Sequence, residues 1–103
     1  MQFMTLSRRV TEKFSDAEFG PFIEPEAELA RALYIDGFIR QIWHRDEPGG
    51  GACLLIEATS EAEVRETLAT LPLVAAGMLE VVSVTALRPY GGFGPRLTSE
   101  AGF

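Results

Sequence analysis

The sequence is poor in the residues that build metal and disulfide sites. It has one cysteine, Cys53, and one histidine, His44, among 103 residues. A single cysteine excludes an intrachain disulfide and a cysteine-rich metal site, and a single histidine leaves no paired histidine ligands. Cys53 lies inside an apolar run, where a thiol packs as a small hydrophobic group. We therefore expect a protein without a metal centre.

Long apolar runs are also absent. The run "LPLVAAGML" (71–79) falls well short of the roughly 20 residues that cross a bilayer. The N-terminal stretch "MQFMTLSRRV" has its basic residues after the apolar part, whereas a signal peptide has them before it. These features predict a cytoplasmic protein with no membrane partner.

Positive charge is scarce. Nine Lys and Arg residues, only one of them a lysine, face fifteen Asp and Glu residues, which gives a formal net charge of −6. No basic stripe exists to neutralise a phosphate backbone, which argues against nucleic-acid binding. The three glycines 49–51 lack the Lys and Ser/Thr that follow them in a phosphate-binding loop. We expect no cofactor.

Two segments carry helix signatures. In the first, Gly20–Pro21 is a breaker, Pro25 suits a first helical turn, and Gly37 suits the residue after the last turn. This predicts a helix over about 24–36, with an acidic N-terminal end. In the second, Ser60 and Glu63 form a capping-box pattern, and Pro72 ends the helix at or just before Leu71.

Four segments are rich in strand-forming residues, and the order of elements is β-α-β-β-α-β. This order is the ferredoxin-like, or split βαβ, arrangement: an α+β fold with a four-stranded antiparallel sheet and two helices on one face. We predict this domain over 1–89. The predicted strands are 2–10, 38–45, 52–58 and 79–87.

Neither of the last two strands has a fully polar face. In 79–87 one face holds Leu79, Val81, Ser83, Thr85 and Leu87, and the other holds Glu80, Val82, Val84 and Ala86. Because the helices can cover only one side of the sheet, we expect a second copy of the chain to cover the other. The Gly/Pro-rich tail 90–103 is expected to dock on a neighbouring subunit.

The span from about Glu28 to Tyr90 resembles the muconolactone isomerase family. The matching pieces are "ELARAL", "DGFIRQIW", "LPL" and "MLEVVSVTALRPY". The resemblance implies a dimeric α+β barrel, with larger rings built from such dimers. It also implies an enzyme of aromatic catabolism that moves a double bond in an unsaturated lactone by proton transfer, without a cofactor.

Strand alternation divides the candidate site residues of 38–45. Arg40 and His44 are expected on one face, with Trp43 on the other. His44 is the residue whose ordinary pKa suits proton transfer near neutrality, unless it is only a solvated strand end. Arg40 could hold a carboxylate of a substrate, or could instead pair with Glu57 or Glu80.

Further candidates come from the helix and from the aromatic residues. Glu26 and Glu28 are possible general bases through the resemblance, although carboxylates at a helix start are usually solvated. Trp43 and Tyr34 could contact a substrate, or could simply pack. The expected ligand is a small, unsaturated, anionic molecule in a pocket between sheet and tail.

Two other functions remain open. One is a non-catalytic oligomeric module for small-molecule binding or assembly, favoured because the opening of the first helix carries only acids where the isomerases carry a basic residue. The other is a cofactor-free oxygenase or polyketide-type cyclase, which rests on analogy of fold.

Overall fold

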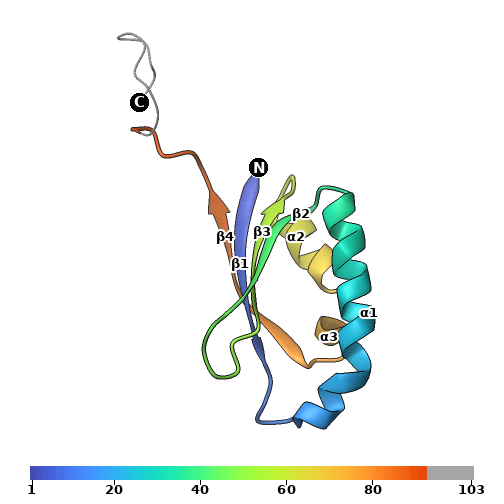
Figure 1. Cartoon of the computed structure of the whole chain (residues 1–103). Coiled ribbons are helices and arrows are strands. Elements are labelled where there is room, and N and C mark those ends of the chain that lie inside the picture. The colour runs from blue at the N-terminus through green and yellow to red at the C-terminus, as the bar shows by residue number, and fades with distance from the viewer. Residues whose placement is uncertain (93–103) are drawn as a thin grey trace, which may run out of the picture.

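A computed structural model of the chain describes residues 1–92. Its strands form one antiparallel sheet in the order β2-β3-β1-β4. All the helices lie on one side of this sheet (Figure 1). The α+β class is confirmed, and the arrangement is compatible with the ferredoxin-like one. The elements are β1 (Gln2–Arg9), α1 (Asp16–Ile35), β2 (Ile39–His44), β3 (Ala52–Glu57), α2 (Glu61–Leu68), α3 (Pro72–Ala75) and β4 (Leu79–Leu87).

The core lies between the sheet and the helices. Phe3 in β1 pairs with Ile56 in β3, and both side chains are almost fully buried. From the helix layer, Val64 and Leu68 of α2 pack against them together with Leu71. Val64, Leu68 and Leu71, which follow the i, i+4, i+7 spacing of one helix face, therefore face the core. Each buried large side chain in this cluster stabilises the fold by about 1.5–3 kcal/mol.

The predicted start of the first helix is wrong. α1 begins at Asp16, and Gly20, Pro21 and Pro25 all lie inside it. Phe19 explains the early start, because this ring is 1% exposed and packs with Leu73 and Met78. Its burial offsets the backbone hydrogen bonds that the prolines remove. The end was predicted correctly: Gly37 follows α1 with φ +88°, and its N–H donates to the Tyr34 carbonyl at 3.0 Å.

The second predicted helix divides in two. Ser60 caps α2 as expected, since its hydroxyl accepts the Glu63 N–H at 3.1 Å. However, α2 ends at Leu68, and Pro72 opens the short helix α3 instead of following a longer α2. A proline at a first helical position loses no intrahelical hydrogen bond, which is why this residue suits a start.

Bulges interrupt the alternation of two strands. The register of β1 with β4 shifts so that Leu6 pairs with Ser83 and Ser7 pairs with Val81. The predicted faces of β4 are wrong for this reason: Val81 and Val84 both pack against the core. On the helix-free side, the strands place five apolar residues together, which we call the outer patch: Met4, Leu6, Trp43, Cys53 and Leu55. β4 ends at Leu87, residues 90–92 form neither helix nor strand, and the rest of the predicted tail lies outside the described residues.

A candidate active-site cavity between the sheet and the first helix

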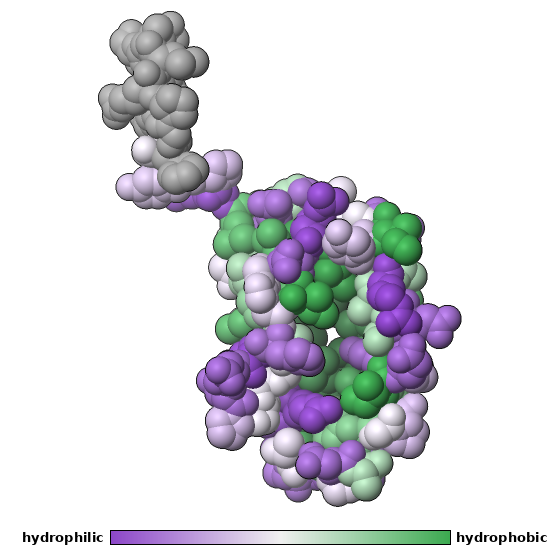
Figure 2. Space-filling model, in the orientation of Figure 1, coloured by the Kyte–Doolittle hydropathy of each residue, from purple (hydrophilic) through white to green (hydrophobic). Residues whose placement is uncertain are grey.

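A cavity of about 720 Å³ lies between the sheet and the helix layer. In the space-filling view a hollow opens between the sheet and α1, with hydrophobic side chains in its depth and hydrophilic ones around it (Figure 2). The volume is within the usual range of small-molecule sites. The cavity lies on the helix side of the sheet, and most of the tail that would line the predicted pocket between sheet and tail lies outside the described residues. Its apolar wall includes Ile39, Leu54, Leu68, Leu71 and Val81.

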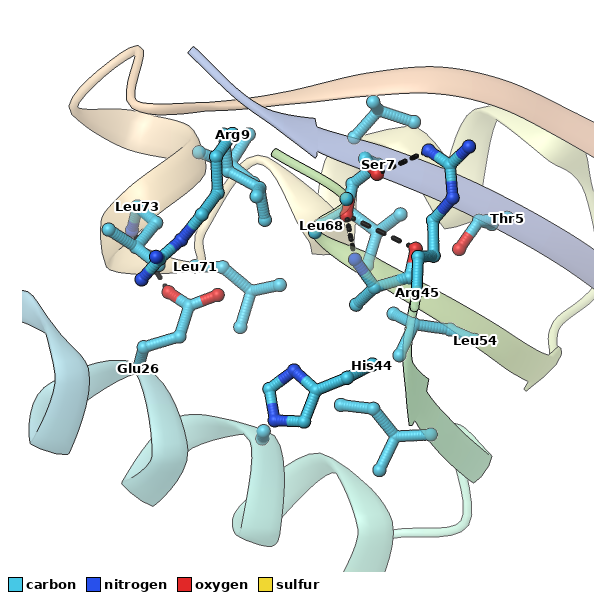
Figure 3. Close-up of a pocket in the computed structure, with 18 of the residues that line it drawn as sticks. Thr5, Ser7, Arg9, Glu26, His44, Arg45, Leu54, Leu68, Leu71 and Leu73 are labelled. Atoms are coloured by element: carbon cyan, nitrogen blue, oxygen red, sulfur yellow. Dashed lines mark hydrogen bonds between the residues drawn. The ribbon is translucent and has the colours of Figure 1, made fainter. Parts of the chain in front are cut away.

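Glu26 reaches this cavity from α1. Its carboxylate accepts the backbone N–H of Leu73, at the start of α3, at 2.9 Å (Figure 3). The side chain is half-buried, and burial raises the pKa of the Glu26 carboxyl, while the hydrogen bond from Leu73 opposes the shift. Ile23 and Ala30, one turn before and one turn after Glu26, line the same cavity. This face of α1 therefore points toward the cavity.

His44 reaches the cavity from the end of β2. It pairs with Ala52 of β3, and Figure 3 shows its imidazole extending toward α1. His44 is exposed as well as cavity-lining, so it stands at the mouth. Two ionisable groups, Glu26 and His44, therefore border one largely apolar space from different elements. Such a pair can take up and return a proton on a bound molecule.

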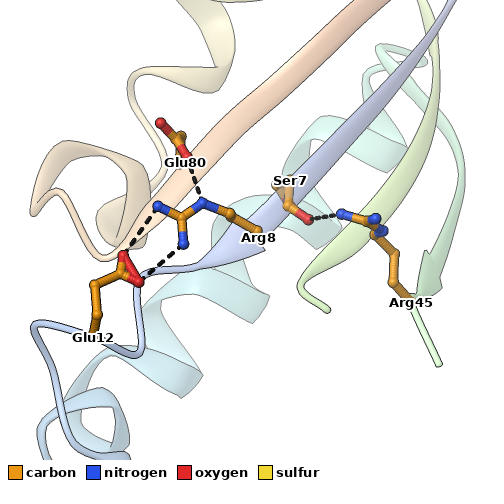
Figure 4. Close-up of polar contacts among 5 residues, drawn as sticks. All are labelled: Ser7, Arg8, Glu12, Arg45 and Glu80. Atoms are coloured by element: carbon orange, nitrogen blue, oxygen red, sulfur yellow. Dashed lines mark hydrogen bonds and ion pairs between the residues drawn. The ribbon is translucent and has the colours of Figure 1, made fainter. Parts of the chain in front are cut away.

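The β2–β3 hairpin loop forms the rim beside His44. Arg45 donates to the carbonyl of Ser7 at 2.8 Å (Figures 3 and 4). It also donates to the carboxylate of Glu47 at 2.6 Å. Gly51 has φ +70°, and a Cβ placed there would lie 2.5 Å from the Ser7 carbonyl oxygen. Only glycine fits this approach without displacement. The three glycines 49–51 thus belong to the hairpin loop, and they also line the cavity.

The Ser7 side chain links β1 to β3 beyond the point where the backbone pairing of these two strands ends. The β1–β3 register stops at Leu6 opposite Cys53. At the next position the Ser7 hydroxyl accepts the Ala52 N–H at 3.0 Å and donates to the Ala52 carbonyl at 3.3 Å. The two strands thus separate by the length of a side chain at the floor of the cavity.

Several predicted site residues lie elsewhere. Regular alternation of β2 was the wrong assumption, because a bulge between Ile39 and Gln41 makes Ile39, not Arg40, share the cavity wall with His44. Arg40 is exposed, and its guanidinium lies beside Gly37. The remaining three do not line the cavity either: Trp43 belongs to the outer patch and is 46% exposed, Tyr34 on α1 is 62% exposed, and Glu28 is exposed.

Sequence reasoning missed the cavity residues of β1. Thr5, Ser7 and Arg9 all line the space. Period-two alternation from the buried Phe3 places all three on the same face of β1, so the sequence does carry a signal for them. By contrast, alternation does not predict the position of Arg45, because this residue lies in the hairpin loop beyond the end of β2.

A second group of charges lies away from the cavity. Arg8 donates to Glu80 at 2.5 Å and to both carboxylate oxygens of Glu12 at 3.0 and 3.1 Å (Figure 4). These bonds raise the pKa of Arg8 and lower that of Glu12. All three side chains are well exposed. Because each charge already has its partner, this cluster has the features of a surface ion-pair network rather than a binding site.

Residues 1–92 do not support a metal site or a membrane span. No group of three or more His, Cys, Asp or Glu residues in this part of the chain could hold a metal ion. None of its helices combines the length and the hydropathy that crossing a bilayer requires. Comparison of the sequence with known protein families and with curated proteins finds no match.

Proposed function

We propose that the chain is a small cofactor-independent enzyme that moves a proton between two carbons of a small unsaturated molecule. This is the reaction type implied by the resemblance to the muconolactone isomerases. The observation that carries the proposal is the convergence of Glu26 and His44 on one largely apolar cavity. Alternative readings of these two residues as solvated groups fit less well with their common position.

The chemistry needs a base and an acid on one bound molecule. One group removes the proton from the carbon that lies between the carbonyl and the double bond, and the electron pair of that C–H bond moves toward the carbonyl oxygen, which gives a dienolate. A proton is then returned to the far carbon, so the double bond moves with no net oxidation. Glu26 suits the first role, because it reaches the cavity and burial raises the pKa of its carboxyl, which makes the carboxylate a stronger base. His44 at the mouth suits exchange of the proton with solvent.

The test is proton exchange in heavy water. The protein is incubated in D2O with a series of small β,γ-unsaturated lactones and carboxylates, and proton NMR follows double-bond migration and deuterium uptake. Turnover is expected in the wild type, with a loss of about 100-fold or more in Glu26→Gln and in His44→Gln. The matched control is Glu28→Gln, an exposed carboxylate on the same helix, which is expected to keep full activity. Full activity in both cavity variants would refute the assignment.

A second function is favoured by one contact. The Glu26 carboxylate already accepts the Leu73 N–H, so it could serve only to hold α3 against α1 in a non-catalytic binding module. In that case the NMR series would show saturable binding to cavity residues with no deuterium uptake in any compound. This outcome separates the two functions, because both predict a ligand and only one predicts exchange.

We also propose that the outer patch is covered by a second copy of the chain, which gives a sheet-to-sheet dimer. The support is the set of five apolar residues on the helix-free side, among which Trp43 is 46% exposed in the single chain. A contiguous apolar surface of this kind usually marks an interface. Two identical sheets packed face to face would bury the outer patch of each chain against that of the other.

A further inference from the structure

Three arginines line the cavity, and they differ in their partners. Arg31 pairs with Glu24 at 2.8 Å, and Arg45 pairs with Glu47 at 2.6 Å. Arg9, at the end of β1, forms no ion pair and no side-chain hydrogen bond with any residue in 1–92. Among the three arginines that line the cavity, Arg9 is therefore the one whose N–H donors are available to a ligand.

Arg9 is held in place by a ring. Its guanidinium lies over the face of Phe19, with the guanidinium carbon 4.4 Å from the ring centroid. The Phe19 ring is itself only 1% exposed, so the core holds it in place and it offers the Arg9 side chain a fixed surface. This cation–π contact uses no oxygen or nitrogen acceptor, so the N–H groups of the guanidinium remain available to a ligand. Those N–H groups match the two oxygens of a carboxylate.

The backbone of Arg9 is fixed as well. Its N–H donates to the carbonyl of Gly49, in the hairpin loop, at 3.1 Å. Figure 3 shows the Arg9 side chain reaching from β1 toward the side of the cavity where Glu26 lies. The free cation and the half-buried carboxyl therefore stand at one end of the space, while His44 stands on β2 beside the loop.

We propose that Arg9 binds the carboxylate of the ligand, and that the ligand is a small organic monoanion with a flat unsaturated body. The inference rests on the proposed function and deepens it by naming the residue that selects the charge. The anionic end would meet the in-plane N–H groups of Arg9, and the body would cross the apolar wall formed by residues such as Leu54 and Leu71. Glu26 accepts the Leu73 N–H, and no ion pair joins it to Arg9 among the described residues.

The experiment compares two probes of the same shape and different charge. Furan-2-carboxylate and furan-2-carboxamide are titrated at neutral pH into the ¹⁵N-labelled full chain, and NMR shifts of cavity residues give the dissociation constants. The carboxylate is expected to bind the wild type about tenfold or more tightly than the amide. In Arg9→Gln this preference should disappear while the amide still binds as before, which also shows that the variant is folded. Arg9→Lys should restore only part of the preference, because an ammonium lacks the planar pair of donors.

Two other arginines complete the design. Arg40→Gln tests the rival anion site on β2, and Arg88→Gln changes an exposed arginine beyond β4 that does not line the cavity. Both are expected to keep the preference for the carboxylate. The proposal is overturned if Arg9→Gln keeps the preference, if Arg40→Gln loses it, or if neither probe shifts cavity residues at up to about 10 mM.

Failure here and failure of the proposed function can be told apart. Charge-selective binding that depends on Arg9, with no deuterium uptake in any substrate, would support this inference and refute the isomerase. Deuterium uptake that is unchanged by Arg9→Gln would support the isomerase and refute the role of Arg9.

Discussion

The carboxylate of Glu26 in α1 accepts the backbone N–H of Leu73 in α3 at 2.9 Å, across 47 residues of sequence. The contact joins two helices, and both residues line the cavity. A carboxylate at the first turn of a helix satisfies an N–H that has no partner within the helix. Glu26 is thus both a structural link and an ionisable group in the cavity, and the two roles can be separated by experiment.

The pH dependence of stability should report the environment of Glu26. Because burial raises the pKa of its carboxyl in the folded protein, the folded state holds this proton more tightly than the unfolded chain does. The stability gained by protonation is fully present below the ordinary pKa of a glutamate and is lost as the pH rises through the folded-state pKa. The free energy of unfolding of Glu26→Gln, relative to wild type, should therefore increase with pH over this window.

Urea unfolding across a pH series measures this difference. The control is Glu28→Gln, whose carboxylate is exposed on the same helix. The pH trend of Glu26→Gln is read against that of this variant. A flat difference for Glu26→Gln would mean that the carboxyl is as well solvated in the folded protein as in the unfolded chain.

Substitution of Gly51 by alanine should destabilise the protein by about 2–4 kcal/mol. The new Cβ would combine the cost of a left-handed backbone with a 2.5 Å approach to the Ser7 carbonyl oxygen. Gly77→Ala is the matched control, since Gly77 has φ +74° but nothing within 4 Å of an added Cβ. It should cost about 1–2 kcal/mol, from the backbone alone. Equal losses in urea unfolding would show that the contact between the hairpin loop and β1 is not tight.

Gly20→Ala should have the opposite effect and stabilise the protein by about 0.5–1 kcal/mol. Gly20 lies inside α1, its φ is negative, and nothing lies within 4 Å of an added Cβ. Alanine gains helix propensity there without a clash. Thermal and urea unfolding measure the change, and a loss of stability would contradict the extension of α1 back to Asp16.

The outer patch predicts the effect of a charge on assembly. Leu6→Glu places a carboxylate among the five apolar residues of the patch and should convert a dimer to a monomer. Ile35→Glu is the control, because Ile35 is 81% exposed at the end of α1, on the helix side. It should leave the mass unchanged in sedimentation velocity at micromolar concentration. A wild type that sediments as a monomer would refute the proposed dimer.

The strand and helix order could be predicted because most local signals agree with the fold. Ser60 caps α2, Gly37 ends α1, and the glycines after His44 form the hairpin. The start of α1 could not be predicted from local rules, since Gly20 and Pro21 argue against helix there. The burial of Phe19 decides it, and that burial depends on Leu73 and Met78 far along the chain.

The candidate site was only partly predictable. Glu26 and His44 were named from the sequence, and both line the cavity. Regular alternation places Arg40 and His44 on the same face of β2. One bulge in this strand is enough to place them on different faces. Bulges depend on the neighbouring strand, so a single strand's sequence carries little sign of them.

The position of the cavity relative to the outer patch has a consequence for regulation. Thr5 and Leu54 line the cavity, while their neighbours Leu6 and Leu55 face the opposite side of the same sheet. Two chains joined through the outer patch would hold their cavities back to back, opening away from each other and sharing no wall. Each would bind its ligand as an independent site, so a hyperbolic saturation curve is expected from the dimer. Any cooperativity would have to pass through the thickness of two sheets.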